Sequence, residues 1–195
     1  MPVGSLYKYK GVRTMSKQYG VESYYRYLQG DDKGLEELVA EYGDALVRFA
    51  YCIVRESSVA EDAVADVFAR MALKRKAFFR EGNLRAYLYK AVRNKCMDYL
   101  RFHRKRVSLS DLENVLIGNR LETDLLSRER NKTLYCCMQR LALQYAQVLY
   151  LVYLEGQTID EASKIMKKSK KQTYNLLARA KASLKDLLQK EGICL

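Results

Sequence analysis

The chain has 195 residues, of which 49% are hydrophobic and 30% charged, so it is long enough for one large domain or two small ones with a buried core. One proline and ten glycines are too few for the turns of a β-sandwich or barrel, and the composition favours helices. The formal net charge of +12 indicates a polyanionic partner.

The first helices are predicted to follow a basic, tyrosine-rich N-terminal extension over residues 1–23. Met15 begins a more regular stretch and is a candidate start codon. From Leu35 to Ile53, apolar residues recur at helical spacing, which predicts a first amphipathic helix. The pair Ser57-Ser58 interrupts the pattern and is predicted to cap the next helix.

The second predicted helix has an apolar side and a charged side. The apolar side consists of Ala63, Val64, Val67, Phe68 and Met71. The charged side carries Glu61, Asp62, Asp66, Arg70 and Lys74. This separation predicts that the acidic residues face away from the core.

A loop with Gly82-Asn83 precedes a third predicted helix, over roughly Leu84 to His103. Its core-facing residues are expected to be Leu88, Ala91, Val92 and Tyr99. A second stripe consists of Lys90, Arg93, Asn94, Met97, Arg101 and Arg104. Such a stripe either follows a phosphate backbone or forms an ordinary solvated face.

The second half of the chain begins after a predicted flexible linker over residues 105–128, which is acidic and lacks strong helical periodicity. Helical patterning resumes past Glu129 and stops at Gly156. No internal repeat is visible. The sequence therefore predicts an all-α protein with two small helical domains, over residues 24–104 and 129–190.

Two capping boxes follow in close succession, at Thr158 with Glu161 and at Ser169 with Gln172. A short turn between the two helices is typical of a helix-turn-helix, although plain bundles contain the same pattern. The inward side of the second helix is predicted to carry Thr173, Leu176, Leu177, Ala180 and Leu184. The outward side presents residue types that contact bases and phosphates, namely Lys170, Lys171, Tyr174, Asn175, Ala178 and Arg179.

Charge is unevenly distributed along these elements. Residues 31–69 carry a net charge of −7, whereas residues 70–106 carry +11 and residues 164–190 carry +8. Two basic blocks suggest two separate contacts with a nucleic acid, and solvated helix faces are the alternative.

The sequence gives little support for a metal site or for a nucleophilic catalytic site. Five cysteines without a CxxC pair, beside the single histidine His103 in a basic run, provide no zinc ligand set and no catalytic triad. We expect buried thiols in a reducing compartment and no cofactor or metal. The sequence contains no signal peptide and no apolar run long enough for a bilayer, so the expected location is the cytoplasm.

Over residues 24 to 190 the chain resembles a bacterial sigma factor of the extracytoplasmic-function (ECF) type, in the sigma-70 family. Stretches similar to sigma region 2 are residues 60–68 (AEDAVADVF), 84–94 (LRAYLYKAVRN) and 98–101 (DYLR). Stretches similar to region 4 are residues 148–156, the helix and turn of 158–169, and residues 177–181 (LARAK). Lys167 stands at the turn where the family usually has glycine.

The resemblance implies a transcription initiation factor without catalytic activity. Glu61, Asp62 and Asp66 would bind the clamp of core RNA polymerase. Region 2 would open and read the minus-ten element of promoter DNA, with Phe79, Asn83, Lys90, Arg93, Asn94 and Arg101. The exposed residues of the last helix would read the minus-thirty-five element. The resemblance also implies an anti-sigma factor as a partner. Membrane insertion is not expected, because the longest apolar run, Val148 to Leu154, has seven residues.

Two other classes compete with this interpretation. A helix-turn-helix regulator that never engages polymerase would account for residues 158–190, but would leave the acidic helix and the first basic helix unexplained. A metal-dependent nuclease would need acids from several elements. Glu61, Asp62 and Asp66 instead lie on one predicted helix face, which argues against that class.

Overall fold

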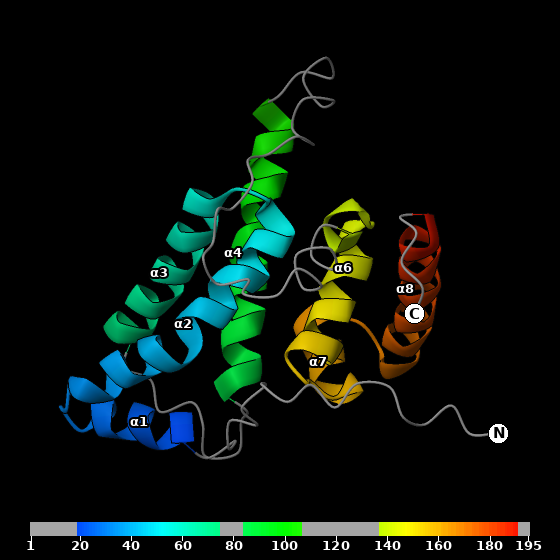
Figure 1. Ribbon diagram of the computed structural model, residues 1–195. Coiled ribbons are helices and arrows are strands. Elements are labelled where there is room, and N and C mark those ends of the chain that lie inside the picture. Colours follow the sequence, from blue (N-terminus) through cyan, green and yellow to red (C-terminus); the bar gives the residue numbers. More distant parts are fainter. Residues whose placement is uncertain (1–18, 75–83, 107–136, 191–195) are drawn as a thin grey trace.

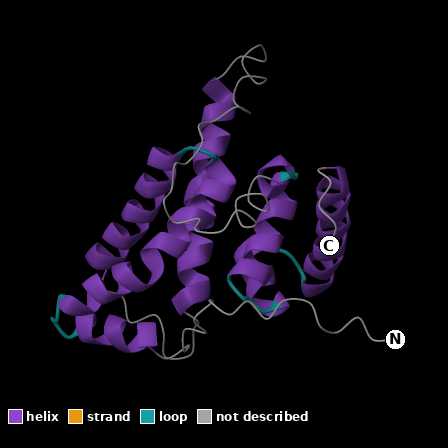
Figure 2. Ribbon diagram, viewed as in Figure 1, coloured by secondary structure: helices purple, strands orange, loops and turns teal. Residues whose placement is uncertain are grey.

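The protein is described from a computed structural model that places residues 19–74, 84–106 and 137–190. The regular elements in these ranges are all helices (Figure 2), which confirms the predicted all-α class. The first unit consists of α1 (Tyr19–Leu28), α2 (Lys33–Val54), α3 (Ser57–Lys74) and α4 (Leu84–Arg106). The second unit consists of α6 (Leu143–Leu149), the π-helix η3 (Tyr150–Leu154), α7 (Ile159–Met166) and α8 (Lys170–Lys190).

Helix α1 was missed by the periodicity analysis, because its buried residues are tyrosines rather than aliphatic side chains. Tyr24 and Tyr27 are both buried, and the Tyr27 hydroxyl donates to the carbonyl of Ala72 at 3.0 Å. Gly34 allows α1 and α2 to approach closely, since a Cβ at this position would overlap the carbonyl oxygen of Ser23. The predicted boundary at residue 24 therefore falls inside a packed helix.

The break between α2 and α3 lies slightly before its predicted position. Ser57 is already the first residue of α3, and the chain turns at Arg55, which has a φ of 61°. The Arg55 amide donates back to the carbonyl of Tyr51 at 2.9 Å, which closes α2. The serine pair is therefore helical. Ser57 Oγ donates to Glu61 Oε1 at 3.1 Å.

The two units pack against each other around a common apolar cluster. Figure 1 shows α4 between the other helices of the first unit and the helices of the second unit. Helix α8 lies on the side of α6 and α7 that faces away from α4. Helix α4 extends to Arg106, so the predicted linker begins inside it, and the remainder of that linker lies outside the described residues. Within the placed ranges, no helix is long and apolar enough to cross a bilayer.

Candidate nucleic-acid and polymerase interface

The acidic face predicted for α3 is present. Glu61 and Asp62 are exposed, on the side opposite the buried residues Ala60, Ala63, Val64, Val67, Phe68 and Met71. These apolar side chains attach α3 to the core and fix which way its acidic side points. Glu61 and Asp62 therefore present adjacent carboxylates on the outer surface of the first unit.

Asp66 differs from the other two acids because its carboxylate is engaged within the fold. Its Oδ2 atom lies 2.9 Å from Lys95 Nζ on α4 and 2.9 Å from Arg70 Nε on α3. The hydrogen bond from Lys95, opposed by partial desolvation, holds the pKa of Asp66 below its usual range, and Arg70 adds to this effect. Asp66 therefore joins α3 to α4, which the sequence did not predict.

The basic stripe of α4 is divided by the fold. Lys90 and Arg101 are exposed, and Arg101 Nη1 pairs with Asp98 at 2.9 Å. Asn94 is half-buried on the same side of the helix, because residues four apart share a face. Arg93 is half-buried as well, and burial together with the nearby Arg101 lowers its pKa. The predicted loop residues Phe79 and Asn83 lie outside the described residues.

The helix-turn-helix has the predicted caps. The Thr158 hydroxyl accepts from the Glu161 amide at 3.2 Å, and Glu161 Oε2 accepts from the Thr158 amide at 2.9 Å. Ser169 and Gln172 make the equivalent pair, at 3.1 and 2.9 Å. Both capping boxes are therefore confirmed, and they define where α7 and α8 begin.

The turn between α7 and α8 contains an unusual lysine. Lys167 has a φ of 56° and a ψ of 46°, a left-handed conformation that glycine adopts more readily. The amides of Lys167 and Lys168 both donate to the carbonyl of Ser163, which ends α7. The turn between α7 and α8 thus forms with lysine at its left-handed position.

Helix α8 has the predicted two faces. Thr173, Leu176, Leu177 and Ala180 are buried and Leu184 is half-buried. The six predicted DNA-binding residues are all exposed, namely Lys170, Lys171, Tyr174, Asn175, Ala178 and Arg179. Tyr174 is the most prominent apolar group among them, with 66% of its surface exposed. This face combines positive charge, an aromatic ring and an amide, which suits a nucleic-acid groove.

Lys170 is oriented by α7. Its Nζ atom lies 2.7 Å from Asp160 Oδ1, and Lys164 Nζ lies 3.0 Å from Asp160 Oδ2. The hydrogen bonds from Lys170 and then Lys164 lower the pKa of Asp160. Asp160 therefore holds Lys164 of α7 and Lys170, the first residue of α8, close to each other.

The structure also reveals a polar contact between the two units that sequence reasoning missed. Arg93 Nε donates to Gln147 Oε1 at 2.9 Å, and Gln147 is fully buried on α6. Arg85 Nη2 pairs with Glu155 Oε2 at 3.0 Å and also donates to the Glu155 carbonyl. The available sequence signal was Gln147 between Ala146 and Val148 in an apolar stretch of α6, since a buried amide requires a partner.

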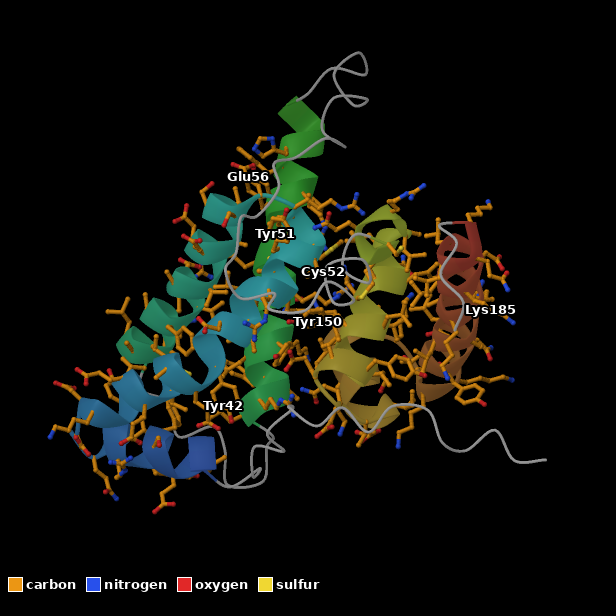
Figure 3. All side chains as sticks on the ribbon, viewed as in Figure 1. Tyr42, Tyr51, Cys52, Glu56, Tyr150 and Lys185 are labelled. Carbon is orange, nitrogen blue, oxygen red and sulfur yellow. The ribbon has the colours of Figure 1, made fainter. Side chains whose placement is uncertain are left out.

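Aromatic packing accompanies these polar contacts. Tyr150 lies between the two groups of helices (Figure 3), and its hydroxyl donates to the carbonyl of Ala45 at 3.2 Å. Its ring lies 5.5 Å from that of Phe49, which in turn lies 5.2 Å from that of Tyr89. Burial raises the pKa of Tyr89, and the neighbouring Glu155 carboxylate raises it further. No cluster of metal-binding side chains occurs in the described ranges.

Comparison with sequence families gives two matches. Residues 38–106 match the family described as "Sigma-70 region 2", and residues 131–184 match that described as "Sigma-70, region 4". The two matches together cover more than half of the chain, and they lie on the two structural units in order.

Individual proteins agree with these matches. The chain is 29% identical over 154 residues to the "ECF RNA polymerase sigma factor SigM" of Bacillus subtilis, covering 78% of this chain and 94% of that protein. It is 26% identical over 164 residues to the "ECF RNA polymerase sigma factor BldN" of Streptomyces coelicolor, covering 82% and 62%.

Two solved structures share the fold. CnrH, solved with the cytosolic domain of CnrY, superposes with a TM-score of 0.65 at 22% identity, covering 88% of this chain and 98% of that one. RpoE of Bartonella quintana, solved with the anti-sigma factor NepR, superposes with a TM-score of 0.69 at 20% identity, covering 80% and 98%.

Proposed function

This chain is a member of the sigma-70 family, of the ECF type, and on that premise we propose that it binds core RNA polymerase and directs it to promoters. The observation that carries this function is the presence of regions 2 and 4 on one chain, each with an exposed basic helix face. A helix-turn-helix regulator would need only the second unit. The match to region 2 therefore favours the initiation factor.

We propose that the chain is divided functionally as the sequence indicates. Residues 24–104, together with the rest of α1 and α4, form the region 2 domain, and residues 129–190 form the region 4 domain. The linker lies between the two domains, and the N-terminal extension precedes them. The protein acts in the cytoplasm and without catalysis of its own, and an anti-sigma factor is a proposed partner. The relatedness to RpoE, which was solved with such a factor, supports that partner.

We propose Glu61 and Asp62 as contacts to polymerase, with Asp66 beside them. The first two carboxylates are exposed and are held on the outer side of α3 by its buried apolar face. Asp66 already binds Lys95 and Arg70, so a polymerase group would have to share it with these cations. Electrostatic complementarity with a basic surface of the polymerase would orient the docking.

We propose that promoter DNA binds to the two basic helix faces, one on α4 and one on α8. Lys90 and Arg101 form the exposed part of the α4 stripe, and Arg93 and Asn94 are half-buried beside them. The loop residues Phe79 and Asn83 precede this helix in the sequence. Opening the minus-ten element costs base stacking, which aromatic and cationic groups offset. The exposed face of α8 would read the minus-thirty-five element in the major groove.

The first test measures polymerase binding. Reversing both Glu61 and Asp62 to lysine should weaken the affinity for core polymerase by about tenfold or more, because two charge pairs become repulsive. The matched control reverses both Glu36 and Asp44 to lysine, since these are two exposed acids on α2 of the same unit and the net charge changes by the same amount. Equal affinities for the wild type and the double variant, with native circular dichroism, would contradict the assigned surface.

The function itself is tested by in vitro transcription with core polymerase on a randomised promoter library. The expected result is the enrichment of templates with two separated elements. If no template initiates above the background of core polymerase alone, the proposed function is wrong.

A further inference from the structure

Two neighbouring lysines begin α8, and they differ in how their side chains are held. Lys170 Nζ lies 2.7 Å from Asp160 Oδ1 on α7, whereas Lys171 makes no ion pair with any residue that the structure places. Both side chains are exposed on the face proposed to bind DNA. The two lysines therefore have the same charge and lie in the same helical turn, but only Lys170 is restrained by a second helix.

The carboxylate of Asp160 is itself held from two sides. Its other oxygen, Oδ2, lies 3.0 Å from Lys164 Nζ, one turn further along α7. The hydrogen bonds from Lys170 and then Lys164 hold the pKa of Asp160 below its usual range, so the group is ionised at neutral pH. The capping box at Thr158 fixes the start of α7, two residues before Asp160. Asp160 therefore presents a charged acceptor to Lys170 from a well-defined position.

The Asp160–Lys170 pair adds little to the stability of the fold. The side chain of Lys170 is 72% exposed and that of Asp160 is 40% exposed, and surface ion pairs of this kind are weakened by solvent. Helices α7 and α8 are already joined by apolar contacts, to which Ala162, Ile165 and Leu176 belong. The main effect of the pair is therefore on the position of Lys170 Nζ.

A restrained lysine suits a base edge better than a phosphate. A free lysine is a point charge on a flexible stem, which binds a phosphate from many directions. With one of its three donors directed at Asp160, Lys170 Nζ has two donors left, and the adjacent carboxylate repels phosphate oxygens. Guanine presents two acceptors, O6 and N7, in the major groove, and lysine is among the side chains that bind them.

Lys170 also lies where a base edge is expected. In a helix-turn-helix, the N-terminal residues of the second helix contact base edges, while the first helix crosses the DNA backbone. Lys170 is the first residue of α8, and Tyr174 lies one turn further along the same exposed face.

We propose that Asp160 is a positioning residue that holds Lys170 to read a guanine in the minus-thirty-five element. Lys170 is then a specificity-determining residue, in contrast to Lys171, which binds a phosphate. The inference rests on the proposed function and deepens it, because it assigns a base to one residue of the α8 face and a role in DNA reading to a residue of α7.

The test is a binding selection from duplexes with a randomised minus-thirty-five element, using the full-length chain alone and in complex with core polymerase. Lys170→Ala should lower the preference for guanine at one position of the element. Asp160→Ala should lower the preference at that same position by about fivefold or more and leave the other positions unchanged. The double variant should lose no more than Lys170→Ala does, because both residues act on one base contact.

Three further variants distinguish positioning from charge and from folding. Asp186→Ala removes an exposed acid from the other end of α8, sixteen residues or roughly 24 Å from Lys170, and should change no base preference. Asp160→Glu keeps the carboxylate and should keep part of the guanine preference. Asp160→Asn keeps the shape without the charge and should change the preference in the same direction as Asp160→Ala. Circular dichroism monitors the helix content of each variant.

The outcomes separate this inference from the proposed function. If Lys170→Ala weakens all sequences alike, Lys170 is a phosphate contact and the inference is wrong. It is also wrong if Asp160→Ala and Asp160→Asn give the base preferences of Asp186→Ala, or if no base is enriched for the wild type. Initiation by the wild type on the promoter library would leave the proposed function intact in each of these cases. A chain that shows the expected changes in base preference but does not initiate with core polymerase would instead contradict the function alone.

Discussion

Lys167 occupies a backbone conformation that disfavours a side chain with a Cβ. Its φ of 56° lies in the left-handed region, where an L-residue is less stable than glycine by about 1–2 kcal/mol. Replacement by glycine also adds freedom to the unfolded chain, which offsets part of this gain. Lys167→Gly should therefore raise the free energy of unfolding by about 0.5–1 kcal/mol.

Urea denaturation measures this prediction as a higher midpoint at an unchanged slope. Lys168→Gly is the matched control, because Lys168 follows directly but does not have a positive φ. That variant should be destabilised. Equal shifts in both variants would show that the backbone conformation of Lys167 does not govern its effect.

Asp66 is the second residue whose local environment leads to a prediction. Lys95 and Arg70 lower its folded-state pKa, so its ionised form stabilises the fold above the pKa of the unfolded chain. This contribution is lost as pH falls through the lowered folded-state pKa. Because both side chains of the Asp66–Lys95 pair are more than one-third exposed, the contribution should be below about 1 kcal/mol.

Asp66→Asn should therefore be slightly less stable than the wild type at pH 7. Its free energy of unfolding should also fall less steeply than that of the wild type as the pH is lowered, because the variant lacks the carboxylate that becomes protonated. Thermal melting between pH 7 and pH 3 compares the two proteins. The control is Asp62→Asn on the exposed side of the same helix. Identical pH profiles for the wild type and Asp66→Asn would show that the ion pair does not contribute to stability.

At the scale of elements, the exposed face of α8 carries two kinds of residue, for which we propose different roles in DNA binding. Asn175 and Arg179 lie four residues apart on its exposed face, and each can make bidentate contacts to a base edge. Lys171 lies in the first turn, where the positive end of the helix dipole favours a phosphate. The two kinds of residue should therefore respond differently to substitution.

Arg179→Ala should change which minus-thirty-five sequences are preferred, at a cost of about 1–3 kcal/mol for each lost base contact. Lys171→Ala should weaken all sequences nearly alike and reduce the slope of log affinity against log salt by about one. Binding selections on a randomised element at two salt concentrations measure both effects. A uniform loss for Arg179→Ala would identify Arg179 as a phosphate contact.

At the scale of the whole molecule, the two units combine local surfaces with a shared interior. The acidic side of α3 and the exposed face of α8 lie on different units, which suits a protein that contacts a polymerase and a duplex at once. The apolar cluster nevertheless continues from one unit into the other through Phe49 and Tyr150. Burial of this shared apolar surface therefore stabilises the packing of the two units against each other.

The sequence alone determined the features that depend on neighbours within a few positions. The capping boxes at Thr158 and Ser169, and the two faces of α8, follow from side chains three or four residues apart, so periodicity and residue type were sufficient. The helical spacing of apolar and charged residues likewise predicted that Glu61 and Asp62 are exposed. It missed α1, whose amphipathic face is built from tyrosines that also occur on exposed surfaces.

Only the tertiary structure determined which candidate site residues already form hydrogen bonds or ion pairs within the fold. Arg93 and Gln147 are 54 residues apart, and Arg85 and Glu155 are 70 apart, so no local pattern could pair them. The partners of Asp66 and Arg93 depend on how α4 is oriented against α3 and α6, which is set by packing of the apolar core. A charged residue on a predicted stripe is accessible only where that packing leaves it uncovered, and Arg93 is left only half exposed.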